Sequence, residues 1–269
     1  MSTTTTEIFR TPDERFEGLP GYDFAPHYAE IDGLRLHYVD EGPREGTPIV
    51  CFHGEPTWAY LYRKMLPPLV AAGHRVICPD YAGFGRSDKP TDRRWYSYDG
   101  HVELMTALLD RLELRGATVV VQDWGGPIGL RWAVEHEERV ERLVVLNTGI
   151  FTGRVSKGFL AWRDFAQKNP DLPVGFVLQG ATKSELAPEV VAAYEAPFPS
   201  PESKARPSSR CWCPPRRTVP AHRRCAMSLT RSRAGRSRRS SRSLTPIPSS
   251  RTPSPARSSA IASPARGPR

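Results

Sequence analysis

An aspartate, Asp123, occupies the apex of a predicted strand–turn–helix. Residues 119–126 read Val-Val-Val-Gln-Asp-Trp-Gly-Gly, an apolar run typical of a buried strand followed by a tight turn into a helix. Such a turn exposes the apex side chain above the end of the sheet. A carboxylate there can displace a leaving group from a saturated carbon, or open a strained ring, and form an ester. The alternative interpretation is that Asp123 only caps the following helix.

A second loop can supply hydrogen-bond donors to the same site. His53-Gly-Glu-Pro-Thr-Trp58 directly follows the apolar run 47–52. The backbone N–H of Glu55, together with that of Trp124, can hold the charge that develops on an oxygen during acyl chemistry. The alternative is an ordinary loop in which Pro56 begins a helix. The two motifs together are more specific than either alone. A third loop, residues 80–87, is interpreted as structural.

Extended and helical segments alternate along residues 27–146, which predicts an α/β fold with a mostly parallel sheet. Residues 27–40 form a hairpin in this interpretation, because Asp32-Gly33 is a turn signal. Beyond residue 149 the pattern changes to helices and loops, as expected of a cap over an active site. We therefore expect an α/β core in residues 1–149 and a helical cap in residues 150–205. Further strands are expected at 47–52, 75–79, 117–121 and 142–146, and helices at 60–72, 97–114 and 127–136.

The three loops resemble those of a known family. Residues 53–58, 80–90 and 119–126 are closely similar to the haloalkane dehalogenases of the α/β-hydrolase fold, and the cap segments 158–162 and 194–199 also resemble that family. The similarity extends over about residues 20–205 and is to the subgroup that holds the halide between two tryptophans. The resemblance implies hydrolysis of a carbon–halogen bond to an alcohol and a halide through an aspartyl ester. It implies a haloalkane and water as reactants, with no metal and no organic cofactor.

The resemblance also assigns roles to individual residues. Asp123 would be the nucleophile, and the N–H groups of Glu55 and Trp124 would form the oxyanion hole. The indoles of Trp124 and Trp162 would bind the halide, because an indole N–H donates without titrating. Pro127 and Phe159 would line the substrate pocket. The alternative for both tryptophans is core packing.

An epoxide hydrolase, or another hydrolase with an aspartate nucleophile, is the nearest alternative function. An epoxide oxygen needs a proton, which a cap tyrosine usually provides in those enzymes, whereas a departing halide needs none. Residues 150–205 contain one tyrosine, Tyr194, which favours the halide. Other candidates are interpreted as structural: Cys51 as core, His53 as a brace for its loop, and His101 and His136 as surface residues on helices.

Composition divides the chain near Arg206. All 29 acidic residues precede it, and residues 206–269 contain arginine, serine and proline but no lysine, aspartate or glutamate. We expect this tail to be disordered, because it cannot bury enough apolar surface to offset chain entropy. Its charge permits an alternative of another class, a nucleic-acid-binding protein. No signal peptide or membrane span is predicted, and we expect a cytoplasmic monomer that binds no nucleic acid.

The base histidine and its acid partner, which this fold needs for hydrolysis of the ester, cannot be identified. His222 is the only histidine of the tail and has no strand before it. Shifting the frame of Ser241–Ser250 by one nucleotide permits Val-Ala-Phe-Ser-Asp-Ser-Asp-Pro-Ile-Phe, a buried strand followed by an acidic loop. We therefore hypothesise a frameshift near Arg206 and expect a truncated enzyme that does not turn over. The absent last strands would leave an apolar sheet edge exposed, so we expect the chain to fold poorly and at best to form the ester without hydrolysing it.

Overall fold

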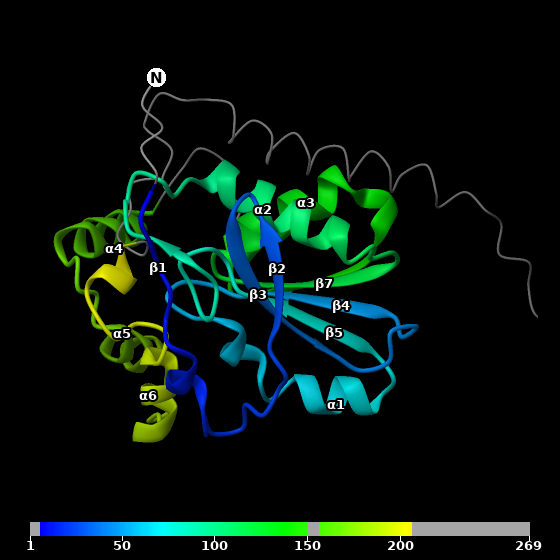
Figure 1. Cartoon of the computed structure of the whole chain (residues 1–269), viewed down its shortest axis with the longest axis horizontal. Helices are drawn as coiled ribbons and strands as arrows, with labels where there is room; N and C mark the ends of the chain where they lie inside the picture. Colours follow the sequence, from blue (N-terminus) through cyan, green and yellow to red (C-terminus); the bar gives the residue numbers. More distant parts are fainter. Residues whose placement is uncertain (1–5, 150–155, 206–269) are drawn as a thin grey trace, which may run out of the picture.

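The computed structural model describes residues 6–149 and 156–205, and its central element is a six-stranded sheet (Figure 1). The strand order is β2-β3-β5-β4-β7-β8. β3 pairs antiparallel with both of its neighbours, and the remaining pairs are parallel. The strands are β2 (His27–Ile31), β3 (Leu34–Glu41), β4 (Pro48–Phe52), β5 (Arg75–Pro79), β7 (Ala117–Gln122) and β8 (Val140–Leu146). The α/β prediction with a mostly parallel sheet is confirmed.

The hairpin predicted in residues 27–40 forms as expected. Asp32 and Gly33 join β2 to β3 with positive φ angles of 49° and 78°. The other strand predictions agree with the structure to within two residues at each end. Strands β4 and β5 were recognisable because they are buried on both faces and therefore apolar at nearly every position.

The helix predicted over residues 60–72 is wrong in its first half. A 3₁₀ turn occupies Ala59–Tyr62, and the α-helix α1 begins only at Leu66 and ends at Ala71. Pro67 and Pro68 stand at its first positions, where their missing N–H groups cost nothing, whereas inside a longer helix they would break it. The next two helices, α2 (Tyr98–Arg111) and α3 (Gly125–Glu135), form near their predicted positions. Ser97 caps α2 by accepting a hydrogen bond from the Gly100 N–H at 3.0 Å.

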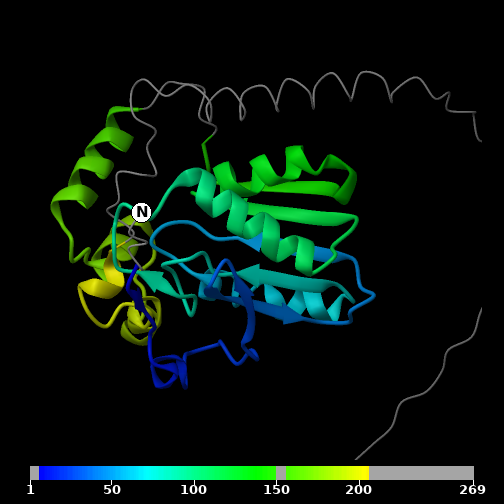
Figure 2. The ribbon, with the colours of Figure 1, turned by 45° about the horizontal axis from the view of Figure 1, so that its top comes forward.

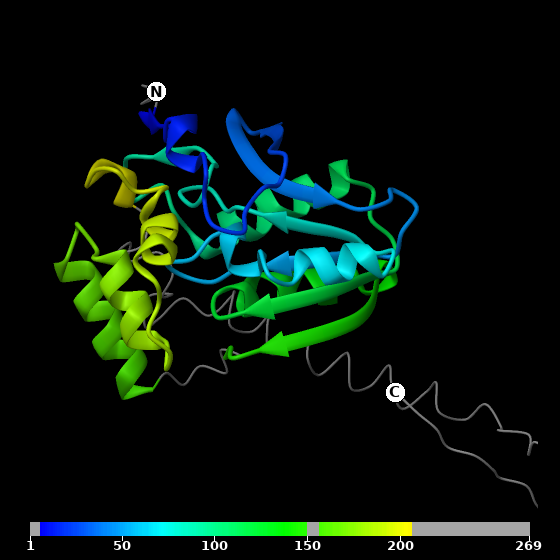
Figure 3. The same cartoon turned by 90° about the horizontal axis from the view of Figure 1, so that it is seen from below.

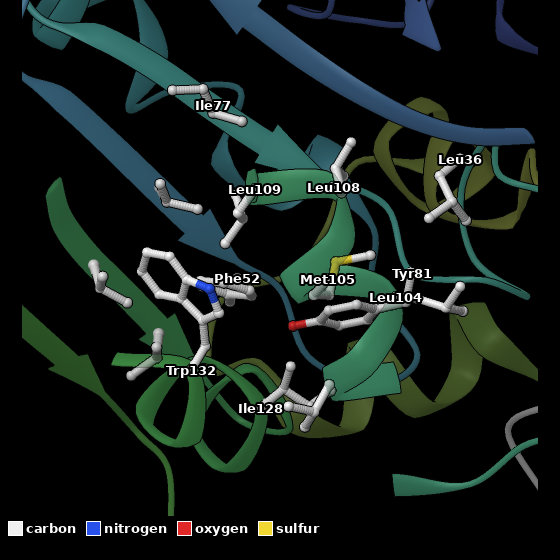
Figure 4. Close-up of a cluster of buried hydrophobic side chains, with 14 of the residues drawn as sticks. Leu36, Phe52, Ile77, Tyr81, Leu104, Met105, Leu108, Leu109, Ile128 and Trp132 are labelled. Atoms are coloured by element: carbon white, nitrogen blue, oxygen red, sulfur yellow. The ribbon is translucent and has the colours of Figure 1, made fainter. Parts of the chain in front are cut away.

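Apolar side chains fill both sides of the sheet. Figure 4 shows one cluster, in which Phe52 and Ile77 of the sheet meet Leu108 of α2 and Trp132 of α3. A second cluster, on the other face, packs Trp58 and Tyr62 against the sheet. The sheet is therefore covered on both faces over most of its width, as in a doubly covered α/β layer structure.

Helices of residues 156–205 gather at one end of the sheet, the end at which the parallel strands finish (Figures 2 and 3). They are α4 (Lys157–Lys168), α5 (Val174–Ala181) and α6 (Pro188–Glu195), followed by a 3₁₀ turn at Glu202–Lys204. No strand interrupts residues 156–205, as expected of a helical cap. The tail 206–269, including His222, lies outside the described residues.

The N-terminal segment connects the core to the helical end of the molecule. Strand β1 (Ile8–Phe9) pairs with β6 (Lys89–Pro90), and a 3₁₀ turn follows at Asp13–Phe16. Arg10 donates two hydrogen bonds to the Asp88 carboxylate, at 2.7 and 2.9 Å. The Thr11 hydroxyl donates to the Pro197 carbonyl at 2.8 Å. None of the helices in the described part of the chain is long and apolar enough to cross a membrane.

Truncating the core stripe of α2 tests this packing. Leu108 is fully buried, so Leu108→Ala removes apolar contacts and leaves a cavity, and we expect the free energy of unfolding to fall by about 2–5 kcal/mol. Leu112→Ala makes the same change at a half-buried position at the end of the helix, and its loss should be clearly smaller. Urea denaturation followed by circular dichroism measures both. Equal losses would contradict the packing of α2.

Candidate active site

Asp123 lies at the turn between β7 and α3, in the left-handed backbone conformation with φ of 49°. This conformation is uncommon for a residue other than glycine and is held by three hydrogen bonds. The Asp123 N–H donates to the Asn147 carbonyl at 3.2 Å, and the Asp123 carbonyl accepts the Gly126 N–H at 2.9 Å and the Thr148 hydroxyl at 2.5 Å. The predicted strand–turn–helix is therefore present, with the carboxylate at its apex.

Two glycines permit the close approach of the loops. A Cβ atom on Gly125 would lie 2.1 Å from the Phe52 carbonyl oxygen, and one on Gly54 would lie 2.4 Å from the Asp123 Cβ. No side chain larger than hydrogen fits at either position without movement of the backbone. The end of β4 and the start of α3 are thereby brought against the same carboxylate.

Backbone donors contact the Asp123 carboxylate. The Glu55 N–H donates to Asp123 Oδ1 at 2.9 Å, and the Trp124 N–H also donates to the carboxylate. Burial raises the pKa of Asp123 above its ordinary value, and these two N–H groups only partly offset that effect by favouring the charged form. The structure thus brings together the three groups that the sequence analysis assigned to nucleophile and oxyanion hole. Their catalytic roles remain predictions.

The predicted halide and pocket residues lie on two helices. The buried Trp124 indole faces the Phe159 ring of α4, with centroids 6.2 Å apart. Trp162, one turn further along α4, is half-buried and packs on Phe165 at 5.9 Å. Pro127 is buried in the first turn of α3, where its carbonyl accepts the Tyr98 hydroxyl at 2.9 Å. The structure therefore places the Phe159 ring against the Trp124 indole. Halide binding by the two indoles remains a prediction.

A buried polar network supports the loop that carries Glu55. His53 Nδ1 lies 2.9 Å from the Gly54 carbonyl, so His53 braces its own loop as expected. Asp80 accepts the Ala59 N–H at 2.7 Å with Oδ1, and Oδ2 lies 2.7 Å from His37 Nδ1. Burial alone would raise the pKa of Asp80, but His37, His53 and the Ala59 N–H together hold it below its ordinary value.

The sequence analysis did not predict that His37 and Asp80 form a buried pair beneath the Glu55 loop. His37 belongs to a hairpin strand and Asp80 follows a different strand, so only the sheet pairing brings them together. The position of an acidic residue directly after a buried strand was the available signal for Asp80.

Of the two histidines predicted to lie at the surface, His101 is buried and His136 is half-buried. His101 was expected at the surface but is 1% exposed, because the first turn of α2 packs its ring onto Tyr96 and Tyr81. His136 is half-buried and stacks on Trp132 at 5.3 Å. Cys51 is buried in the core as expected. The hydrogen bonds that the described residues make to the Asp123 carboxylate come from backbone N–H groups, and none comes from a histidine.

Comparison with known proteins identifies the class first. The family model of the alpha/beta hydrolase fold matches residues 47–187, which include both loops that contact Asp123. The fold and the strand–turn–helix with its backbone donors are therefore those of an α/β hydrolase.

Individual relatives then identify the family within this class. The haloalkane dehalogenase of Mycobacterium marinum is 50% identical over 206 residues, covering 74% of this chain and 69% of the relative. That of Psychrobacter cryohalolentis is 49% identical over 205 residues, covering 74% and 68%. The tetrameric haloalkane dehalogenase DpaA of Paraglaciecola agarilytica superposes with a TM-score of 0.79 at 34% identity, covering 83% of this chain and 77% of that one. The chain belongs to the haloalkane dehalogenases, and the resemblance seen in its sequence is confirmed.

The raised pKa of Asp123 predicts how the free energy of unfolding depends on pH. Because the pKa of Asp123 is raised in the folded chain, the folded state binds the proton more tightly, and stability falls as pH rises through the unfolded and then the folded pKa. We expect Asp123→Asn to raise the free energy of unfolding at pH 7, with the gain disappearing below about pH 4. Urea titrations at several pH values measure this difference. The exposed Asp23→Asn should show no such pattern, and an Asp123→Asn chain that is less stable at pH 7 would contradict the prediction.

Proposed function

We propose that this chain attacks haloalkanes through Asp123 and forms an alkyl ester. The hydrogen bond from the Glu55 N–H to Asp123 Oδ1 is the observation that carries the proposal, because it places a backbone donor of the neighbouring loop on the carboxylate at the apex of the turn. That oxygen attacks the carbon bearing chlorine or bromine, the carbon–halogen bond breaks, and the halide leaves with the bonding electrons. The Trp124 and Trp162 indoles stabilise the departing halide.

Water completes the reaction in the intact form of such an enzyme. A base removes a proton from water, the hydroxyl adds to the ester carbonyl, and the N–H groups of Glu55 and Trp124 hold the oxyanion before the alcohol leaves. The proposed base and its acid partner have no counterpart among the described residues that contact Asp123. We therefore propose that this chain forms the ester and stops there.

The position of Tyr194 supports a halide over an epoxide as the leaving group. Its ring packs edge-on against Tyr60 at 4.9 Å, and its hydroxyl accepts a hydrogen bond from Arg63 at 3.5 Å. Tyr194 thus belongs to the second apolar cluster, whereas Trp124 and Phe159 pack in the first.

We also propose that residues 1–149 are the hydrolase core and that residues 150–205 are its cap, in a cytoplasmic monomer. The gathering of α4, α5 and α6 at the end of the sheet where Asp123 lies supports the cap assignment. The composition change near Arg206 supports a shifted reading frame from that point.

Resequencing the coding DNA across codons 195–215 tests the frameshift. We expect one inserted or deleted base, whose correction restores an acidic loop and a downstream histidine. An unaltered frame would contradict this part of the proposal.

Intact-mass spectrometry tests the ester. After incubation with 1-bromobutane or 1-chlorobutane we expect one butyl adduct per chain on the peptide that carries Asp123, with bromide or chloride release of about one equivalent and no sustained turnover. Asp123→Asn should form no adduct, whereas Asp164→Asn, on the exposed surface of α4, should react like the unaltered chain. Adduct formation by the Asp123→Asn chain would contradict the nucleophile assignment, and repeated turnover would show that a base is present.

A further inference from the structure

Two free cysteines lie side by side in the interior of the sheet. Cys51 belongs to β4 and Cys78 to β5, and these strands are parallel neighbours (Figure 1). Their register pairs Val50 with Ile77, so the next residue of each strand, Cys51 or Cys78, occupies the following pair of positions. The two thiols are hydrogen-bonded to each other, and both residues are buried. Two sulfur ligands therefore stand together, and the reaction proposed for Asp123 uses neither.

The surroundings of the two thiols are apolar, apart from one carboxylate. In the row of side chains that crosses this face of the sheet, Val39 lies beside Cys78 and Val120 lies beside Cys51. All four residues belong to the second apolar cluster. Burial raises the pKa of the Cys78 thiol, and Cys51 and the negative charge of Asp80 raise it further. An ion that binds here must therefore neutralise two thiolates without leaving a net negative charge.

The spacing of the strands favours a bridging atom over a direct disulfide. Side chains at paired positions of parallel neighbours project in the same direction, about 4.8 Å apart. A disulfide needs Cβ atoms about 3.5–4.5 Å apart, so its formation would pull β4 and β5 together. Both strands are held on each edge by another strand of the sheet, which resists this movement. An atom placed between the two sulfurs requires no such approach.

The ligand set also restricts the class of cation. Thiolates favour soft cations. A structural Zn²⁺ takes four ligands, and no group of three or more side chains suited to a metal occurs in residues 6–149 and 156–205. A monovalent cation with two thiolates would leave a buried negative charge near Asp80, which is unfavourable. A soft divalent cation that is stable with two ligands forms a neutral complex, as Hg²⁺ does with two thiolates.

We propose that Cys51 and Cys78 form a two-coordinate site for a soft divalent cation, for which Hg²⁺ is the probe. Binding breaks the two S–H bonds, forms two sulfur–metal bonds and releases two protons to the solvent, with no change of oxidation state. The folded chain holds the two thiols together, whereas in the unfolded chain a long loop must close before both can bind one cation. The cation therefore stabilises the folded state. The site is independent of the reaction proposed for Asp123.

The test uses the full chain with three substitutions in its tail, so that only two of its five cysteines remain. The substitutions are Cys211→Ser, Cys213→Ser and Cys225→Ser. The chain is incubated with one equivalent of HgCl₂ and with glutathione as a competing monothiol, for a long time because burial makes entry slow. We expect intact-mass spectrometry to show one mercury per chain, the loss of two protons and no bound glutathione. Urea denaturation should have a higher midpoint with Hg²⁺ than without it, and an unchanged or lower midpoint would overturn the proposal.

Single-cysteine variants of this chain test the pairing of the two ligands. With Cys51→Ala or Cys78→Ala, the glutathione concentration that removes half of the mercury should fall at least about a hundredfold, because the chain no longer supplies the second thiolate. Any mercury that remains on these variants should carry glutathione. Val39→Ala is the matched control, because it removes buried volume from the same row of side chains without removing a thiol, and it should retain mercury like the three-substitution chain.

Three results would contradict the site. The first is retention of mercury by a single-cysteine variant as strong as that of the three-substitution chain. The second is an equal loss of mercury by the Val39→Ala control, which would show that retention reports only the packing of the core. The third is a chain whose mass is already lower by two hydrogens before mercury is added, because a direct Cys51–Cys78 disulfide would contradict the argument from strand spacing.

Discussion

The hydrogen bond from the Glu55 N–H to the Asp123 carboxylate joins two loops that are 68 residues apart in the chain, and the arrangement of the sheet end depends on it. β4 and β7 must lie side by side in parallel for the two loops to meet, and their register pairs Phe52 with Val121. The contact also needs residues without side chains at Gly54 and Gly125. A buried carboxylate without such donors would carry an uncompensated desolvation cost.

A second buried carboxylate, Asp80, holds the segment that follows the Glu55 loop through the Ala59 N–H. Asp80 accepts hydrogen bonds from the backbone of Ala59 and Arg86 and contacts the His37 ring, so each of its oxygens is used. A buried charge is tolerated only when it is paired and hydrogen-bonded in this way. The two aspartates therefore differ in task. Asp80 organises the loops, whereas Asp123 accepts hydrogen bonds from the backbone N–H groups of Glu55 and Trp124 and has its pKa raised by burial.

The sequence predicted those features that depend on local pattern. The strands β4 and β7 were visible as apolar runs, and Asp123 at the turn was visible from the glycines that follow it. The late start of α1 was missed because helical spacing was given more weight than the Pro67-Pro68 pair. The burial of His101 was missed because its helix packs against a loop more than a dozen residues away, a tertiary contact that no local pattern encodes. The pairing of His37 with Asp80 likewise arises only from sheet pairing across 43 residues.

The contact between Thr11 and Pro197 has a consequence for how the chain folds during synthesis. Residues near the N-terminus leave the ribosome first, yet the Pro197 carbonyl and the Ala196 carbonyl bound by Arg15 are made 186 and 181 residues later. Contacts of such long sequence separation form slowly, because a large loop must close before they contribute. The side chains of Thr11 and Arg15 must therefore remain without these two partners until almost all of the described chain has emerged.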